Sequence, residues 1–432
     1  MLFSKEVTDE EYEEFATGII DPQIFHARFF VLLKCFQVLD GPIPKWTHMT
    51  KIFMALCAII AQILLSLSIY HGINNFDISF ITEAGTYFFV MSYKLLILSC
   101  TKFNIANYHS LQRSMKEDFL YVCNKGGKYR KSFFYNQIQT RKICKLAMIF
   151  TGGIAVCMVA FAVFALIFYL ATNSAGEGKR PLLFPFWAFD TDFGLTPTYE
   201  IAFTFSNTCV IAYAFNYIFM IVTQIIWIRE IVAKADIIIL CIQDLMDGIH
   251  PTNDKKEKDY FGILIKTRMK EIIKHHHSMN TQVLFIHLNR YSFCNLIEHY
   301  AGVYKKLLLF EQKICAPVVC LSAYSATEKF ETGEFNAILI ILCIGAVTLI
   351  FVPSYLCTLL SVKISSICYA CWDIPFWNAS PMIRPYLVLI MQRSLMPLPL
   401  TAPGFEEVSV QTFSNKMASA YSFFNMLRQA NI

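Results

Sequence analysis

Long uncharged apolar stretches recur along the chain and predict its architecture. Four of them contain no Asp, Glu, Lys or Arg: residues 52–70, 146–172, 201–228 and 335–362. About 20 apolar residues in a helix cross the roughly 30 Å hydrocarbon core of a bilayer. These stretches are therefore predicted to be membrane-spanning helices, and those with surplus length are expected to tilt or to continue past the membrane.

Three further spans are predicted in segments that contain polar residues. Residues 78–101 are apolar and aromatic apart from Glu83 and Lys94, and residues 307–326 include two charges and a proline. The last span is predicted at 408–427. We expect the long side chain of Lys94 to extend to the membrane surface, where its charge stays hydrated, with a role in a conformational change as the alternative.

The last span, 408–427, carries a polar stripe along one helical face. The polar positions recur at spacings of three and four, and they are Gln411, Asn415, Ser419, Ser422, Asn425 and Gln429, with Met426 beside them. The residues that fall largely opposite are Phe413, Met417, Ala420, Tyr421, Phe424 and Leu427. Each unsatisfied polar group costs several kcal/mol in hydrocarbon, so the stripe must face protein or water. We interpret it as the lining of a water-filled path, and polar packing against neighbouring helices is the alternative.

Lys and Arg are distributed unevenly among the segments between the spans. Residues 102–145 hold ten of them against two acidic residues, and residues 229–290 hold ten more. The other connections, 71–77, 173–198 and 327–334, are poor in Lys and Arg. Because cytoplasmic loops carry the excess of Lys and Arg, the N-terminus is predicted to be cytoplasmic and the C-terminus extracellular. That orientation is the reverse of a G-protein-coupled receptor.

The composition agrees with a polytopic membrane protein. Of the 432 residues, 56% are hydrophobic and 16% are charged, which is too apolar for an ordinary soluble protein. Helical patterns continue outside the membrane over 225–247 and from 260 to about 300. We predict an all-α fold with seven transmembrane helices and a cytoplasmic helical bundle, which either anchors assembly or covers only its own chain. The predicted regions are a cytoplasmic N-terminal region at 1–51, spans one to four at 52–228, the cytoplasmic helical segment at 229–306, spans five and six at 307–362, a cytoplasmic helix and loop at 363–404, and the last span with a short tail at 405–432.

Motifs for enzyme chemistry are missing from the sequence. It contains no phosphate-binding glycine-rich loop, nucleophile elbow or paired catalytic carboxylates, so we predict no catalytic residues and no enzyme activity. His275–His277 and the Cys368/Cys371 pair have no second pair of ligands at metal-site spacing, and we predict neither a metal site nor a cofactor. The net charge of +5 belongs to the cytoplasmic loops, so nucleic acid is not an expected partner.

One C-terminal pattern resembles a known family. The matching residues are Met391-Gln392-Arg393-Ser394, Pro397, Thr401-Ala402, Phe405, Thr412-Phe413, Ala420-Tyr421-Ser422-Phe423-Phe424 and Leu427. Together they resemble the C-terminal signature of insect odorant receptors, and the length, span number and orientation agree across nearly the whole chain. The chain departs from that signature at Met396, where a basic residue often precedes the proline, and at Pro403-Gly404. The Thr-Tyr and Gln-Phe ending usual in gustatory receptors, which share the fold, is absent.

The resemblance implies a subunit of a ligand-gated, weakly selective cation channel that assembles as a heterotetramer with an olfactory co-receptor. The long insertion after the fourth span that marks the co-receptor is missing, which implies the odorant-tuned subunit. The resemblance also implies the plasma membrane of sensory neuron dendrites, with membrane lipid and a small volatile odorant as further partners. In that family the last helix lines the pore, which assigns pore or gate positions to Ser419, Ser422, Met426, Gln429 and Ala430.

The same resemblance places the odorant site among spans two, three, four and six, in the outer half of the membrane. The candidate residues are Phe88, Met91, Phe161, Phe164, Phe168, Phe203, Asn207, Val210, Ile341 and Gly345. We expect an aromatic, uncharged pocket for a small and mostly apolar volatile, with Asn207 or a hydroxyl making one hydrogen bond. For each aromatic residue, ordinary packing is the alternative. Two other function classes stay open, a receptor that signals through a soluble partner and a transporter that uses the polar stripe.

Overall fold

The computed structural model describes residues 18–39, 45–172, 180–189, 191–249, 255–280, 296–331, 333, 336–374, 383–396 and 407–430. The regular secondary structure of these residues is helical apart from one isolated β-bridge between Ala188 and Thr191, which confirms the predicted all-α fold. In chain order the helices are α2 (Pro22–Phe25), α3 (Ala27–Cys35), α4 (Lys45–Asn75), α5 (Ile78–Phe103), α6 (Ile105–Lys125), α7 (Gly127–Thr172), α8 (Thr198–Gln243), the 3-10 helix η1 (Asp244–Met246), α9 (Lys255–Asn280), α10 (Leu296–Glu331), α11 (Ala337–Asp373), α12 (Arg384–Ser394) and α13 (Val410–Ala430).

Six of the described helices are long and apolar enough to cross a membrane, namely α4, α5, α7, α8, α10 and α11. Each of them coincides with one of the first six predicted spans. Helix α13 coincides with the seventh, and its 21 residues would cover about 31 Å at 1.5 Å per residue. It is not among the six because its polar stripe lowers its hydropathy, so the count of seven spans stays a prediction.

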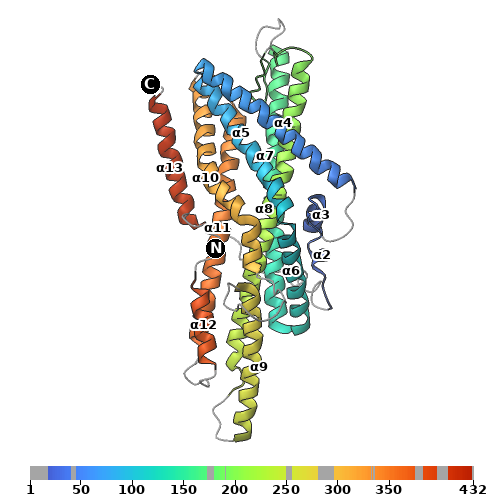
Figure 1. Ribbon diagram of the computed structural model, residues 1–432, viewed down its shortest axis with the longest axis vertical. Coiled ribbons are helices and arrows are strands. Elements are labelled where there is room, and N and C mark those ends of the chain that lie inside the picture. The colour runs from blue at the N-terminus through green and yellow to red at the C-terminus, as the bar shows by residue number, and fades with distance from the viewer. Residues whose placement is uncertain are drawn as a thin grey trace.

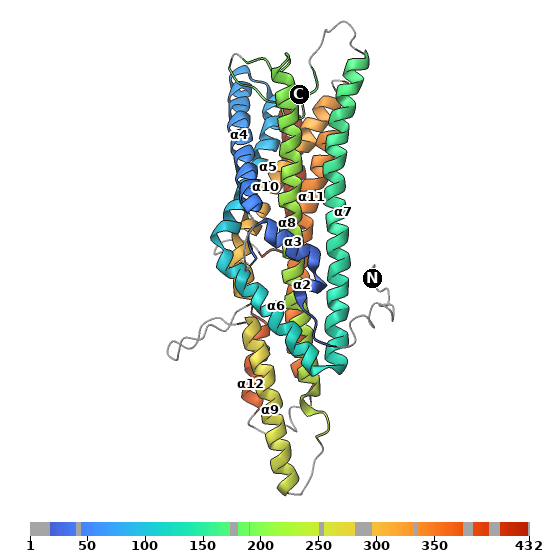
Figure 2. The same cartoon turned by 90° about the vertical axis from the view of Figure 1, so that its right-hand side faces the viewer.

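Helices α7 and α8 are much longer than a membrane crossing requires. Each has 46 residues, or about 69 Å of helix, against a hydrocarbon core of roughly 30 Å. In Figures 1 and 2 they run from the top of the elongated bundle far into its lower half, where α6 and α9 lie. The helical pattern over 225–247 is confirmed as far as Gln243, followed by η1. The helix predicted from 260 to about 300 is observed as α9 and the start of α10, and residues 281–295 between them lie outside the described residues.

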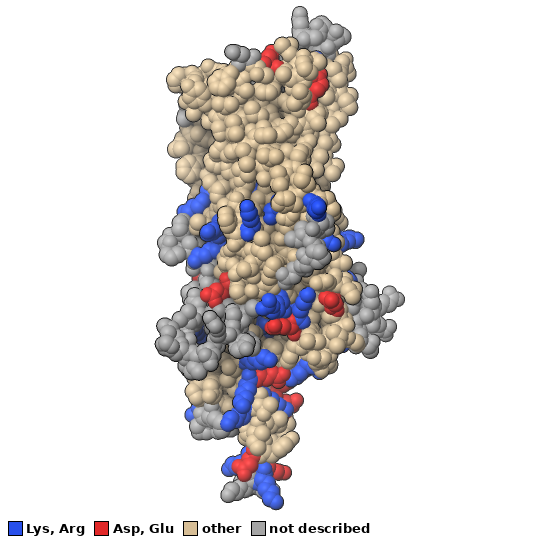
Figure 3. Space-filling model, turned by 45° about the vertical axis from the view of Figure 1, so that its right-hand side comes forward, with Lys and Arg blue, Asp and Glu red and all other residues tan. Residues whose placement is uncertain are grey.

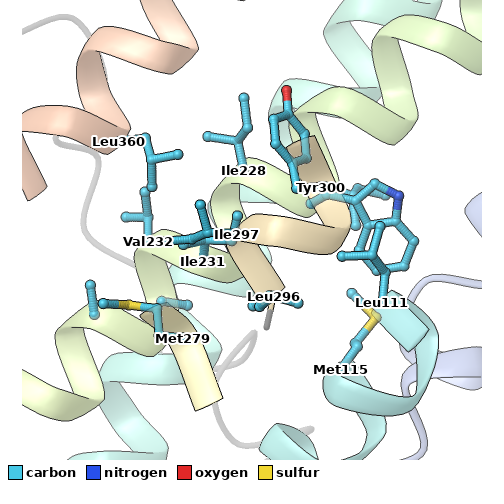
Figure 4. Close-up of a cluster of buried hydrophobic side chains, with 14 of the residues drawn as sticks. Leu111, Met115, Ile228, Ile231, Val232, Met279, Leu296, Ile297, Tyr300 and Leu360 are labelled. Carbon is cyan, nitrogen blue, oxygen red and sulfur yellow. The ribbon is translucent and has the colours of Figure 1, made fainter. Parts of the chain in front are cut away.

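An apolar core joins five helices where α9 ends and α10 begins (Figure 4). The side chains labelled there come from α6, α8, α9, α10 and α11, and all are buried: Leu111, Met115, Ile228, Ile231, Val232, Met279, Leu296, Ile297, Tyr300 and Leu360. Burying a large apolar side chain from water contributes roughly 1.5–3 kcal/mol. This core therefore stabilises the lower half of the molecule as a packed bundle that supports the membrane-spanning helices above it.

Charged side chains divide the molecule into two halves. Figure 3 shows a band of Lys and Arg across the middle, charges of both signs below it, and few charges above it. Within the lower half, Lys234 Nζ on α8 lies 2.9 Å from a carboxylate oxygen of Asp118 on α6, and both side chains are buried. The large apolar part of the upper surface suits hydrocarbon, and a band of Lys and Arg is typical of a membrane boundary.

The expectation that Lys94 extends to the membrane surface is wrong. Its side chain is fully buried on α5, and among the described residues its ammonium has no hydrogen-bond partner. The other charge on this helix, Glu83, is held by Lys329 of α10, with 2.6 Å between Oε2 and Nζ. Lys94 is buried because α5 packs against both α4 and α8, so its face of the helix has no path to the surface.

Candidate functional site

A cavity lies between α5, α7, α8, α10 and α11 in the upper half of the bundle, and its volume is about 90 Å³. Its wall contains the face of α7 formed by Thr151, Ile154, Ala155 and Met158, whose spacing of three, one and three residues is that of one helical face. Phe184, from the segment between α7 and α8, also lines it. The cavity is therefore built by helices far apart in the sequence.

The lining of the cavity is apolar and aromatic, and no charged side chain is among the described residues that line it. Two lining hydroxyls, Tyr87 Oη and Thr151 Oγ1, are buried and have no hydrogen-bond partner in the described part of the chain. A third, that of Tyr93, donates to the carboxylate of Glu311 on α10. A buried polar group without a partner costs about 1–3 kcal/mol, so the first two hydroxyls favour a ligand that offers a hydrogen bond.

Four of the predicted odorant residues lie together in the wall of this cavity: Met91 of α5, Val210 of α8, and Ile341 and Gly345 of α11. At Gly345 a Cβ would meet no heavy atom within 4 Å, so the absent side chain leaves space on that side. The structure therefore joins parts of spans two, four and six around one apolar space. That this space is the odorant site stays a prediction.

Three predicted aromatic residues of α7 lie elsewhere. Phe161, Phe164 and Phe168 are 42%, 64% and 61% exposed on the outside of the chain, and they do not line the cavity. At about 100° per residue they are turned roughly a quarter of a revolution from the face that begins at Thr151. Hydropathy did not reveal this rotation, because residues 146–172 of α7 carry no charge on any side.

The remaining predicted residues lie beside the cavity without lining it. Phe88 and Phe203 are half-buried in the neighbouring apolar cluster. The side-chain amide of Asn207 donates to the backbone carbonyl of Phe203, at 2.8 Å, on its own helix. The nitrogen of Asn207 is therefore occupied locally, whereas its buried Oδ1 has no hydrogen-bond partner in the described part of the chain. Asn207 does not line this cavity, so its polar contact with a ligand stays a prediction.

Sequence reasoning missed Tyr87, Thr151, Phe184 and the whole contribution of α10, which includes Phe310. Tyr87 lies one helical turn before Met91, and Thr151 interrupts an apolar run with a hydroxyl. Helical periodicity could therefore have placed Tyr87 on the same face as Met91, and it could have marked Thr151 as a polar position in the apolar span. The contact of α10 with α5 could not be predicted from the sequence pattern, because periodicity does not show which helices pack against each other.

The second candidate site is α13, which lies at one edge of the bundle beside α10 (Figure 1). Its inner face packs through Phe413 and Met417 against the main core, and Ala420 is buried. The described members of the stripe that are exposed on the outer face are Gln411, Asn415, Ser419, Ser422, Met426 and Gln429. Asn425 is half-buried, and Tyr421, predicted on the apolar side, is 67% exposed. The side chain of Ala430 lies outside the described residues.

The serine hydroxyls of the α13 stripe are satisfied within the helix. Ser419 and Ser422 donate to the backbone carbonyls of Asn415 and Ala418, at 2.9 and 3.0 Å. Near the end of the helix, Arg428 forms an ion pair with Glu331 of α10, at 3.1 Å. The stripe is thus a polar outer face of the chain, held in place from behind by α10.

A family model described as 7tm Odorant receptor matches residues 81–421, which is most of the chain. The chain belongs to the odorant receptor family. This is a family of receptors and not of enzymes, and the matched range includes every helix that lines the cavity.

Two Drosophila melanogaster proteins share parts of this odorant receptor sequence. Odorant receptor 85f is 27% identical over 128 residues, which are 30% of this chain and 32% of that protein. Odorant receptor 67c is 24% identical over 179 residues, which are 41% of this chain and 39% of that protein. The matches thus span between a third and two fifths of these relatives.

The fold is similar over nearly its full length to a solved odorant receptor. The structure of the insect olfactory receptor OR5 from Machilis hrabei matches with a TM-score of 0.70, covering 94% of this chain and 98% of that one at 12% identity. The same receptor in complex with eugenol matches with a TM-score of 0.69 at 13% identity, with the same coverage. The helical architecture described above is therefore that of an insect odorant receptor.

Proposed function

We propose that this chain is the odorant-binding subunit of a ligand-gated cation channel. The observation that carries the proposal is the outer face of α13, where a polar stripe runs along a helix beside six apolar spans and is exposed on the single chain. Such a face requires water or other subunits in a membrane. Four such faces around an axis would enclose a polar path for ions, with Met426 close to its outer end.

The proposed ligand is a small volatile that is mostly apolar and carries one hydrogen-bonding group. The apolar wall supports this class, and the unpartnered hydroxyls of Tyr87 and Thr151 supply the polar contact. The volume of about 90 Å³ is smaller than the ~150 Å³ of an engineered apolar cavity that holds benzene. The lining side chains must therefore move to accommodate a ligand of the size of benzene or larger. The OR5 receptor solved with eugenol supports a small organic ligand for this fold.

Helix α10 is the proposed connection between ligand and pore. Phe310, Ile314 and Val318 of α10 line the cavity, and the same helix packs against α13 along its length. A ligand opens the channel only as far as it binds the open arrangement more tightly than the closed one. A hundredfold preference would supply about 2.7 kcal/mol for each occupied site.

The proposed assembly is a heterotetramer with the olfactory co-receptor in the plasma membrane of sensory neuron dendrites. The Lys- and Arg-rich lower half would lie in the cytoplasm and the end of α13 outside. Helix α13 supports the assembly, because a single chain leaves its polar outer face exposed and neighbouring subunits around a pore would enclose it.

The test is current recorded from cells that express this chain together with a co-receptor. Volatiles of graded size are applied to excised patches without nucleotide and with G-protein signalling blocked. The channel proposal predicts odorant-evoked current that needs both chains. Strict dependence of that current on a G protein would overturn it, as would saturable uptake of a substrate without current.

A further inference from the structure

A second cavity lies between the N-terminal helices α2 and α3 and the long helix α7, with a volume of about 480 Å³. Its rim carries four cations, Arg28 on α3 and Arg141, Lys142 and Lys145 on α7, and all four are exposed. Of the described residues that line it, none is acidic. The cavity thus combines four positive charges at one opening.

The floor of this cavity is apolar. Phe29 of α3, Met148 of α7, and Val222 and Ile226 of α8 line it beneath the cations. Its one lining histidine, His26, is buried, and its Nε2 lies 2.9 Å from Oε1 of Gln137. Burial lowers the pKa of His26 to about 4, so it is neutral at physiological pH and the positive charge stays at the rim.

The cavity lies where the surface of α7 changes from charged to apolar. Immediately after Lys145, the exposed side chains on α7 are Leu146, Ile149 and Phe150, at 57%, 62% and 44% exposure. The long uncharged run of α7 begins at Leu146. On the other wall, Val31 of α3 is 59% exposed beside the cationic Arg28. Lipid acyl chains would therefore meet the cavity from one side and water from the other.

We propose that this cavity binds the headgroup of an anionic phospholipid of the cytoplasmic leaflet, with Arg28, Arg141, Lys142 and Lys145 around the phosphates. Phosphate oxygens accept charge-assisted hydrogen bonds from Arg and Lys, and basic pockets between helices at the cytoplasmic surface suit polyphosphorylated headgroups. The acyl chains of the same lipid lie along the apolar surface of α7 that starts at Leu146. This site is separate from the odorant cavity and does not rest on the channel proposal.

Bound lipid would tie the N-terminal helices to α7. The contacts between them include the His26–Gln137 hydrogen bond, the Phe25 ring 5.8 Å from that of Phe134 between centroids, and the Arg141 guanidinium 5.2 Å from the centroid of the Phe25 ring. A polyanion between Arg28 and the three α7 cations would bridge the two walls directly. The lipid therefore acts as a structural ligand of the lower bundle.

The test is native mass spectrometry of the full-length chain purified in neutral detergent. Phosphatidylinositol 4,5-bisphosphate and phosphatidylcholine with matched acyl chains are offered at equal concentration. We expect at least about tenfold preference for the anionic lipid. The variant with Arg28→Gln, Arg141→Gln, Lys142→Gln and Lys145→Gln is expected to lose most of that preference.

A matched control removes the same charge elsewhere on the lower half. Arg113→Gln, Lys266→Gln, Lys270→Gln and Arg384→Gln also replace two Arg and two Lys, all exposed and all outside the cavity. This control is expected to keep the lipid preference within about twofold, since only non-specific attraction is reduced. A smaller variant, Arg28→Gln with Lys145→Gln, gives an intermediate loss and covers the case in which the fourfold variant fails to fold.

Three results would overturn the proposal. The first is equal loss of lipid binding in the fourfold variant and its control. The second is equally tight binding of soluble inositol trisphosphate, which would make the occupant a free phosphate compound. The third is lipid binding that occurs only after deletion of residues 2–17, because the acidic segment with Glu10, Glu11, Glu13 and Glu14 would then be the natural occupant.

Discussion

At the scale of single residues, Gly345 leaves space in the wall of the cavity that we propose for the odorant. Gly345→Val places two methyl groups where a Cβ now meets no heavy atom within 4 Å. In a cavity of about 90 Å³ this reduces the room for a ligand, so the odorant concentration for half-maximal current is expected to rise at least about tenfold, or 1.4 kcal/mol. Gly153→Val on the exposed face of α7 is the matched control and should leave the response unchanged. Equal effects of the two variants would contradict the assignment of the cavity.

Tyr87 offers the cavity a buried hydroxyl without a partner in the described part of the chain. Tyr87→Phe removes that hydroxyl and keeps the ring against Phe184, whose centroid is 4.6 Å away. We expect responses to ligands with a hydrogen-bonding group to weaken about fivefold, because one buried hydrogen bond is worth roughly 1 kcal/mol. Responses to hydrocarbons of the same shape should stay the same. Dose–response curves for paired alcohols and hydrocarbons measure the difference, and an equal shift for both would exclude the contact.

Lys94 is a buried amine without a hydrogen-bond partner among the described residues. Lys94→Met keeps the length of the side chain and removes the polar group, so stability is expected to rise by about 1–3 kcal/mol. Thermal unfolding of the purified protein measures this, with Lys102→Met at the exposed end of α5 as the control. A fall in the melting temperature would instead show that the Lys94 ammonium makes a stabilising interaction.

At the scale of helices, acid should loosen α9 from the lower bundle. Burial lowers the pKa of His275 and His276 from 6.5 to about 4. Between pH 6.5 and 4 the unfolded chain binds protons at these histidines that the folded chain does not bind. The free energy of unfolding is therefore highest above pH 6.5 and decreases as the pH falls toward 4. The loss is roughly 3 kcal/mol for each histidine, as an order of magnitude. The melting temperature should therefore fall between pH 7.5 and 5.0.

The control for this acid effect is the double variant His275→Gln, His276→Gln, which has no titrating group at these positions. Its melting temperature should change less between the two pH values than that of the wild-type protein. An unchanged pH dependence in the double variant would assign the acid sensitivity to other groups.

Hydropathy located the long helices because each contains a strongly apolar window of membrane length, and four of the spans carry no charge at all. The same uniformity hid their rotation, which is why Phe161 was assigned to the cavity while Thr151 was not. For α13 the pattern was more informative, since polar and apolar residues alternate around the helix and the outward face of Ser419 and Ser422 followed from their spacing. Contacts between helices, such as those of α10 with α5, depend on packing that periodicity does not encode.

At the scale of the whole molecule, the upper and lower halves of the structure differ in surface charge and in the features that they contain. The upper half contains α13 and the cavity that we propose for the odorant, whereas the lower half is a charged helical bundle with an apolar core (Figures 3 and 4). The proportions of the fold were predictable from the lengths of the apolar runs and the Lys- and Arg-rich segments. The N-terminal helices α2 and α3 were not, because they are short and the apolar run in α3 is far below the length of a membrane span, and with them the second cavity escaped prediction.

The central claim is that ions pass along the outer face of α13 when the cavity is occupied. Accessibility of single introduced cysteines to a charged thiol reagent, measured during odorant-evoked current, tests it most directly. Ser419→Cys and Ser422→Cys are on the stripe, and Met417→Cys on the packed face is the control. The account predicts that the reagent alters the current at both stripe positions, only while odorant is present, and leaves the control and the wild-type protein unaffected. Current that is insensitive to modification at both stripe positions would contradict it.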